Sequence, residues 1–349
     1  MSERSQALRR GRSAGPTGPA VVALGGGHGL AASLSALRHL SERLTAVVTV
    51  ADDGGSSGRL RTELGVLPPG DLRMALSALC DDTEWGRTWR DVLQHRFSSS
   101  GSLDRHAVGN LLIVALWEQV GDAVAGLDLV GQLLGARGRV LPMSSVPLAI
   151  EADVLGLDAD PARAVVVHGQ GAVATTEGHV VGVRLLPPDP PARPEVLEAV
   201  SAADWVVLGP GSWFTSVIPH LLVPDLAAAL LATPARRCLV LNLAAERGEA
   251  SGMSAADHVR ALAAHAPELR LDAVLADPSA VEDVDDLSGA VAALGARLVL
   301  RQVGRGGVPE HDPLRLAAAF RDVFDGVEGD VEGRPGAPGA TRRGRAAGR

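Results

Sequence analysis

Three glycine-rich segments in this 349-residue chain each follow a short apolar run of the kind that forms a buried strand. They lie at 25–30 (GGGHGL), 52–58 (DDGGSSG) and 209–212 (GPGS). Glycine lets a backbone approach a phosphate closely, and the N-terminus of a following helix presents unpaired N–H groups to an anion. Because the carboxyl ends of parallel strands share one sheet edge, the pattern predicts a nucleotide or phosphosugar site built from three loops.

These segments supply most of the candidate ligand-binding residues. They are Gly25, Gly26, Gly27, His28, Gly29 and Leu30 in the first segment, Asp52, Asp53, Gly54, Gly55, Ser56 and Ser57 in the second, and Gly209, Gly211 and Ser212 in the third. A tight strand–helix turn that binds nothing would use the same residue types, but three such turns at one edge favour phosphate contact.

Three aspartates could act on a phosphorylated ligand. Asp52 and Asp53 follow the second predicted strand, where carboxylates could hold Mg²⁺ or accept hydrogen bonds from sugar hydroxyls. Because adjacent side chains diverge, we expect Asp52 to face the ligand and Asp53 to be structural. Asp71 is predicted to be the N-cap of the next helix, and capping alone would explain it. If a metal binds, Asp52 and Asp71 are its candidate ligands; no cofactor is expected to be obligatory.

All 33 basic residues are arginines, and tyrosine is absent too. The lack of lysine excludes a Walker A loop, a Schiff base and a lysine general base. Arg59, Arg61 and Arg73 are therefore the nearest candidates to neutralise a diphosphate.

Three further polar residues begin or end predicted core elements. His106 and Asn110 lie one turn apart at the start of an apolar helix, and Asn242 lies near the end of a strand over 238–243. Each could contact a ligand at the predicted edge. A buried hydrogen-bond network would also explain the His106–Asn110 pair.

Strands alternate with helices, which predicts an α/β fold with a doubly wound, mostly parallel, Rossmann-like sheet. Expected strands lie at 21–24, 44–50, 146–154, 164–167, 180–185, 205–208, 238–243, 273–276 and 297–303, and expected helices at 30–40, 195–203, 255–264 and 313–324. A helical insertion is expected at about 70–136, near the binding edge. Residues 19–325 would form a single α/β nucleotide-sugar-binding domain between a disordered N-terminal segment (1–18) and a disordered Gly/Ala/Pro/Arg tail (326–349).

Charge and hydropathy limit the classes of partner and the compartment that the sequence allows. The formal net charge is −8, and removing +3 at residues 1–20 and +5 at 334–349 leaves about −16, which argues against nucleic-acid binding. No apolar run reaches the ~18 residues of a membrane span, and no secretory h-region precedes the first strand. Cys80 and Cys238 are expected to be buried thiols in a reducing compartment. We therefore expect a cytoplasmic protein.

Six motifs occur in a characteristic order. They are GGGHG (25–29), VTVADDGGSSGR (48–59), PPGDLR (68–73), HAVGNLL (106–112), GPGS (209–212) and HDP (311–313). In this respect the chain, from about residue 20 to 325, resembles the gluconeogenesis factor (YvcK-like) family, which shares its fold with 2-phospho-L-lactate transferase. The resemblance implies that the 25–30 loop, residues 52–57, Asn110 and the 209–212 loop line a nucleotide-sugar site.

The resemblance also implies a function. It indicates a cytoplasmic regulator that binds a UDP-sugar, notably UDP-N-acetylglucosamine, and supports cell shape and wall synthesis, with peptidoglycan precursor control, during gluconeogenic growth. An enzyme of amino-sugar synthesis would be its protein partner, and this role is compatible with an oligomer. Two departures stand out: His28 stands where many members have threonine, and LAAERGE (243–249) replaces a loop that usually reads MTQPGET.

Two enzyme classes remain as alternatives. A Mg²⁺-dependent nucleotidyl- or phospholactyl-transferase could use the same loops and carboxylates. An NAD(P)-dependent oxidoreductase is disfavoured, because Leu30 occupies the third position of the dinucleotide fingerprint, where glycine or alanine is required.

Overall fold

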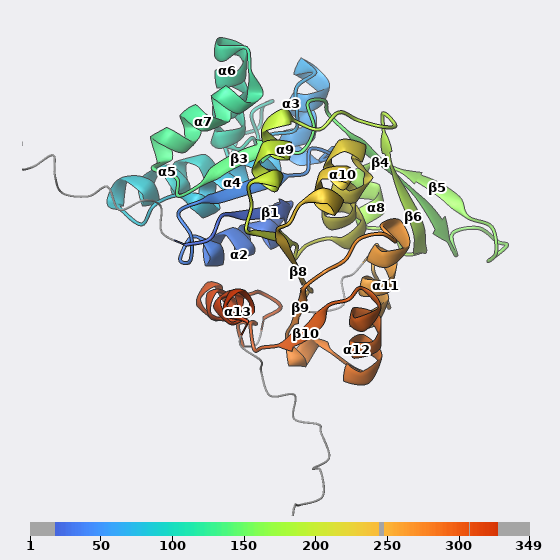
Figure 1. Cartoon of the computed structure of the whole chain (residues 1–349). Coiled ribbons are helices and arrows are strands. Elements are labelled where there is room, and N and C mark those ends of the chain that lie inside the picture. Colours follow the sequence, from blue (N-terminus) through green and yellow to red (C-terminus); the bar gives the residue numbers. More distant parts are fainter. Residues whose placement is uncertain (1–17, 244–247, 307, 327–349) are drawn as a thin grey trace, which may run out of the picture.

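The computed structural model describes residues 18–243, 248–306 and 308–326. Its centre is a seven-stranded parallel sheet in the order β10-β9-β8-β7-β1-β2-β3, and a three-stranded antiparallel sheet, β5-β4-β6, lies beside it (Figure 1). The parallel strands are β1 (Val21–Gly25), β2 (Leu44–Val48), β3 (Arg139–Pro142), β7 (Trp205–Leu208), β8 (Arg236–Val240), β9 (Ala273–Ala276) and β10 (Arg297–Leu300). The antiparallel strands are β4 (Ala149–Leu155), β5 (Val165–His168) and β6 (His179–Leu186).

The burial patterns of the strands explain the two sheets. Every residue of β1, β7 and β9 is buried, as expected for parallel strands covered on both faces. β4 instead alternates strictly between buried and partly exposed residues, which suits an antiparallel sheet with one solvated face.

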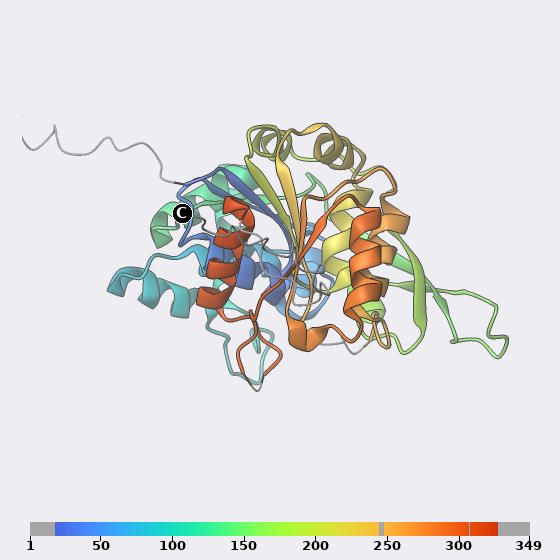
Figure 2. The ribbon, with the colours of Figure 1, turned by 60° about the horizontal axis from the view of Figure 1, so that its bottom comes forward.

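Helices cover both faces of the parallel sheet. They are α2 (Gly27–Leu37), α3 (Gly55–Leu64), α4 (Gly70–Leu79), α5 (Glu84–Gln94), α6 (Val108–Val120), α7 (Ala123–Leu134), α8 (Gln170–Ala174), α9 (Pro194–Ser201), α10 (Pro224–Ala232), α11 (Ala255–His265), α12 (Val284–Ala293) and α13 (Pro313–Asp325). α2 contacts α4 and α13, whereas α9 contacts α10 and α11 contacts α12. Figure 2 shows strands of the sheet between α13 on one side and α11 and α12 on the other.

The chain reverses its direction of winding between β1 and β7. From β1 it continues to β2 and β3, and from β7 it continues the opposite way to β8, β9 and β10. β1 and β7 are parallel neighbours, with Leu24 opposite Leu208. Open α/β sheets bind ligands at the carboxyl ends of the strands where such a reversal occurs. The first and third glycine segments follow these two strands.

The structure confirms the α/β fold with a mostly parallel, doubly wound sheet. The expected strands at 146–154, 164–167 and 180–185 exist as β4, β5 and β6, but they form the separate antiparallel sheet. β3, α10 and α12 were not anticipated. β3 is only four residues long and ends at a proline, so its sequence carries little strand signal.

The expected helical stretch at 70–136 contains α4 to α7. It is not wholly an insertion, because α4 packs directly on β2, β3 and α2. The expected disordered segments lie outside the described residues, except for Gly18 and Gly326. Cys80 and Cys238 are buried free thiols, as expected. Within the described ranges no single helix is long and apolar enough to cross a membrane; Trp213–Leu222 and Pro224–Ala232 reach that length only as a pair bent by 78°.

Candidate ligand-binding site

A cleft of about 820 Å³ lies at the reversal point, between the first and third glycine loops. This volume is in the range of ligand pockets. Eight residues predicted from the sequence line it: Gly26, Gly27, His28, Gly29, Asp71, Gly211, Ser212 and Asn242. The remaining wall comes from α2, α8, the 210–216 segment and residues 309–311.

The first and third glycine loops are in direct contact. A Cβ atom on Gly29 would lie 2.1 Å from the Pro210 carbonyl oxygen, and one on Gly26 would lie 2.5 Å from Asp71 Oδ2. A side chain at Gly29 would force the two loops apart, and one at Gly26 would displace the Asp71 carboxylate. Glycine is therefore required here by the close approach of two backbone segments and a carboxylate.

Asn242 holds the third loop in place. Its Oδ1 accepts a hydrogen bond from the Gly211 amide at 2.9 Å, and its Nδ2 donates to the Gly211 carbonyl at 3.0 Å. The Phe214 amide donates to Glu249 Oε1 at 2.9 Å. The Gly211 and Phe214 amides of this segment thus already have protein partners.

The third loop also does not lead into a regular α-helix. It is followed by a π-helical turn, Trp213–Val217, and a 3-10 segment, Ile218–Leu222, and Ser212 makes no side-chain capping bond. Trp213 and Phe214 are fully buried, and this packing overrides the regular helix that the strand–turn pattern predicted. An anion at this loop would therefore not face the amino end of a long helix dipole.

Asp71, in the cleft wall, and Asp52, behind it, form a pair of carboxylates whose charges interact. Asp52 Oδ1 accepts from the Gly54 amide at 2.9 Å, and a Cβ on Gly70 would lie 2.9 Å from Asp52 Oδ2. Asp71 lies in the first turn of α4, whose N-cap is Pro69, so the expected capping role of Asp71 is wrong. Its carboxylate instead accepts a hydrogen bond from the Gly27 amide of the first loop.

Ionisation of both carboxyl groups of the pair is unfavourable. Burial, and then the charge of Asp52, raise the pKa of Asp71 to about 7, although the Gly27 amide and Arg73 oppose this rise. Burial also raises the pKa of Asp52. Two close carboxylates with raised pKa values favour a bound cation or a shared proton.

Comparisons with known proteins identify the family. The sequence profile described as “2-phospho-L-lactate transferase CofD” matches residues 21–288. The chain belongs to the CofD family. A Mycobacterium tuberculosis (strain H37Rv) protein named “Putative gluconeogenesis factor” is 56% identical over 310 residues, 88% of this chain and 90% of the relative. The “Gluconeogenesis factor” of Bacillus subtilis is 36% identical over 88% of this chain and 98% of the relative.

A solved structure supports the same assignment. The crystal structure of a UPF0052 family member from Bacillus halodurans matches with a TM-score of 0.77 and 32% sequence identity, covering 88% of this chain and 100% of that chain. The CofD-type fold and the resemblance to gluconeogenesis factors are thus confirmed.

Several predicted residues of this CofD-family chain lie behind or beside the cleft. Asp53 points away from Asp52, and its Oδ1 accepts from the Gly171 amide at the start of α8 at 3.0 Å. The side chain of Leu30 is buried in the core. The Gly209 carbonyl accepts from Ser33 Oγ at 2.8 Å. Gly25, Gly54, Gly55, Asp52 and Ser57 are also absent from the cleft wall.

Ser56, His106 and Asn110 form a buried network behind the second loop. Ser56 Oγ lies 3.1 Å from His106 Nδ1 and accepts from Asn110 Nδ2 at 3.1 Å. Asn110 Oδ1 accepts from Arg73 Nε at 2.9 Å. Burial lowers the pKa of His106. The geometry is the satisfied hydrogen-bond network that the sequence left open as an alternative.

Neither Arg59 nor Arg73 lines the cleft. Arg59 donates to the Ser102 and Asp104 carbonyls at 3.1 and 2.7 Å, on the far side of α3. Arg73 lines a second cavity on the other side of α2's first turns. Direct neutralisation of a diphosphate in the cleft by these two arginines therefore has no geometric support.

The sequence did not point to several cleft residues. Gln170, Ser216, Pro309, Glu310 and His311 all line it. Burial lowers the pKa of His311 to about 4, so its imidazole is neutral at physiological pH. The HDP motif was the available signal for His311. Residues 244–247 of the divergent loop lie outside the described residues, whereas Glu249 supports the third loop.

Proposed function

We propose that this protein is a cytoplasmic regulator that binds a UDP-sugar such as UDP-N-acetylglucosamine and supports cell shape and wall synthesis during gluconeogenic growth. The observation that carries the proposal is the glycine-walled cleft at the sheet reversal, with Asp71 in its wall and Asp52 behind that wall. The names of these two relatives support the gluconeogenic context.

Asp52 and Asp71 fit a divalent cation that would lie between the cleft wall and a bound diphosphate. Mg²⁺ is commonly bound by one or two carboxylates together with substrate phosphates and waters. Asp52 and Asp71 would hold it, and it would supply the positive charge that the arginines do not bring to this wall. Its binding would also lower the pKa of Asp71 and remove the repulsion within the pair.

The other walls have separate roles in this proposal. The Gly26–Gly29 backbone would lie against the phosphates because no side chain separates it from the cleft. Asn242 would fix the third loop, and neutral His311 with Gln170 would offer hydrogen bonds to the sugar or base. An enzyme of amino-sugar synthesis remains the proposed protein partner.

Calorimetric titration of the full chain with UDP-N-acetylglucosamine and Mg²⁺ tests the proposal. We expect saturable one-to-one binding that Asp52→Asn weakens at least tenfold. Asp53→Asn is the matched control, because the adjacent carboxylate is bonded to Gly171 instead, and it should stay within threefold of wild type. Absence of heat at millimolar ligand, with a folded sample, would reject the proposal.

A second function is favoured by the same carboxylate pair and by the family profile. A Mg²⁺-dependent phospholactyl- or nucleotidyl-transferase would also need cation-bridged phosphates in a glycine-walled cleft. Phosphorus NMR of the protein with nucleotide substrates and Mg²⁺ separates the two functions. New phosphorus resonances that Asp52→Asn abolishes would establish turnover. Unchanged spectra with retained ligand binding would exclude the transferase and favour the regulator.

A further inference from the structure

A second cavity, of about 600 Å³, lies between α2, α4 and α5. Four arginines line it: Arg38 from α2, Arg73 from α4, Arg90 from α5 and Arg96 just after α5. It shares His28, Ala31 and Ser35 of α2 with the cleft, so the two spaces meet along one helix. Arg73 ends the PPGDLR motif, whereas Arg38, Arg90 and Arg96 lie outside the six motifs that carry the family resemblance.

Arg73 is the central member of the cluster. It is 3% exposed, and it donates hydrogen bonds to the neutral amide oxygens of Asn110 and Gln94 rather than to a carboxylate. Within the described residues it forms no ion pair within 4.0 Å. Arg96 adds repulsion to the burial of this cation, and the charges of Asp71 and Asp52 offset only part of the two effects. A buried guanidinium held by neutral groups is costly unless an anion completes its surroundings.

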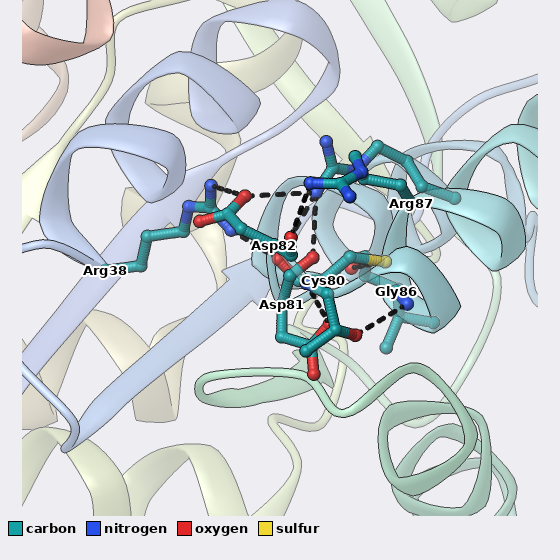
Figure 3. Close-up of polar contacts among 9 residues, drawn as sticks. Arg38, Cys80, Asp81, Asp82, Gly86 and Arg87 are labelled. Carbon is teal, nitrogen blue, oxygen red and sulfur yellow. Dashed lines mark hydrogen bonds and ion pairs between the residues drawn. The ribbon is translucent and has the colours of Figure 1, made fainter.

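Arg38 and Arg90 share one acid. Arg38 lies 2.7 Å from Asp82 Oδ1, and Arg90 lies 3.6 Å from the same atom. Both also donate to the Cys80 carbonyl. Figure 3 shows Arg38 meeting Asp82 beside the chain segment at Cys80 and Asp81. These contacts fix the two guanidinium groups without fully neutralising them.

The charges and the unpaired groups of the cavity fit a phosphate. Its lining contains four arginines and one acid, Asp91, and Asp82 is paired with two of them from outside, which leaves two positive charges without an ion-paired acid; Asp71 and Asp52 act on Arg73 only from beyond ion-pair distance. A phosphate monoester carries about −1.5 to −2 near neutrality. Ser77, also in the lining, is 3% exposed, and its buried hydroxyl has no hydrogen-bond partner in the part of the chain that the structure describes. Arginine is the residue best suited to bind such an oxyanion.

We propose that the arginine cavity binds the phosphate group of a small phosphorylated metabolite, beside and independently of the nucleotide-sugar cleft. Arg73 and Ser77 would contact the phosphate from the inner wall, and Arg90 and Arg96 from the opening. Because α2 forms a wall of both spaces, a metabolite here would adjoin a ligand in the cleft. The proposal does not depend on what the cleft binds.

Inorganic phosphate is the probe, titrated into the full chain at low salt by calorimetry. We expect one saturable site, and the Arg90→Gln, Arg96→Gln double variant should weaken it at least tenfold. Arg87→Gln is the matched control: it lies on the same helix and donates to the Asp82 carbonyl at 2.7 Å, but it does not line the cavity. It should change phosphate affinity less than twofold.

Two further arms keep the result decisive. Ser77→Ala, a smaller change that preserves every arginine, should weaken phosphate binding two- to tenfold if the double variant fails to fold. Phosphate binding should also survive in Asp52→Asn and in the presence of saturating UDP-N-acetylglucosamine. No saturable phosphate binding by wild type, equal binding by the folded variants, or full competition by the nucleotide sugar would overturn the proposal.

Discussion

The two cavities that share the first turns of α2 have walls of opposite charge. The cleft carries Asp71 and Glu310, and no arginine occurs among its described lining residues. The neighbouring cavity carries four arginines and a single acid. A phosphate can enter the second directly, whereas in the first it needs a cation or backbone amides. The comparison shows that a glycine-rich loop alone does not decide how an anion is bound; the charges opposite it do.

The largest expected effect comes from adding a side chain where the first and third glycine loops touch. Gly29→Ala would place Cβ 2.1 Å from the Pro210 oxygen, so two backbones must move. We expect a loss on the order of 4 kcal/mol in the free energy of unfolding, above the usual cost of overpacking. Gly289→Ala, in the interior of α12 with open space around it, should instead stabilise by about 1 kcal/mol. Urea unfolding measures both; a Gly29→Ala protein as stable as wild type would refute the loop contact.

The acidic wall should reveal itself in the pH dependence of stability. The pKa of Asp71 is raised from 3.8 to about 7, so the native state retains a proton that the unfolded state has lost. Ionisation therefore costs stability progressively above pH ~4, and the full cost is present above pH ~7. Asp71→Asn should stabilise the metal-free protein by about 3 kcal/mol at pH 8 and by little at pH 4. Unfolding curves at both pH values check this, and equal effects at the two would contradict it.

A smaller effect is expected where the third loop is anchored. Asn242→Ala leaves the amide and carbonyl of Gly211 without their side-chain partner, which should cost about 2 kcal/mol of stability. Asn242→Asp, which can still accept from the amide, should cost less. Thermal unfolding orders the three proteins, and an alanine variant equal to wild type would show that the anchor is dispensable.

The smallest effect is expected at the wall common to both cavities. The His28 side chain is exposed and forms no hydrogen bond or ion pair with the described residues, so His28→Thr should change stability by less than about 0.5 kcal/mol. Its affinities for UDP-N-acetylglucosamine and for phosphate should each change less than tenfold. Titration with both probes measures this, and a selective loss of one would assign His28 to that cavity alone.

Local signals in the sequence were enough to predict part of this organisation. Apolar runs followed by glycine specify a strand and a tight turn over a few residues, so the loops after β1 and β7 could be predicted to meet at one edge. The direction of the Asp52–Asp53 pair also follows from local geometry. Asp53 turns toward Gly171, whereas Asp52, which we expected to face the ligand, lies behind the cleft wall.

Other features depend on contacts between distant segments. Asp71 looked like a helix cap because an aspartate before an apolar stripe usually is one; its true partner, Gly27, lies on another loop. The irregular turn after Ser212 results from burying Trp213 and Phe214. Arg73 could not be placed in a second cavity from the sequence, since α5 supplies the opposite wall.

A structure of the full chain with UDP-N-acetylglucosamine and Mg²⁺ tests the central claim most directly. The account predicts the diphosphate against Gly26 to Gly29, with the cation between it and Asp71. A diphosphate bound instead in the 730 Å³ space on the far side of α3, beside Asp53, Gly55 and Arg59, would contradict it.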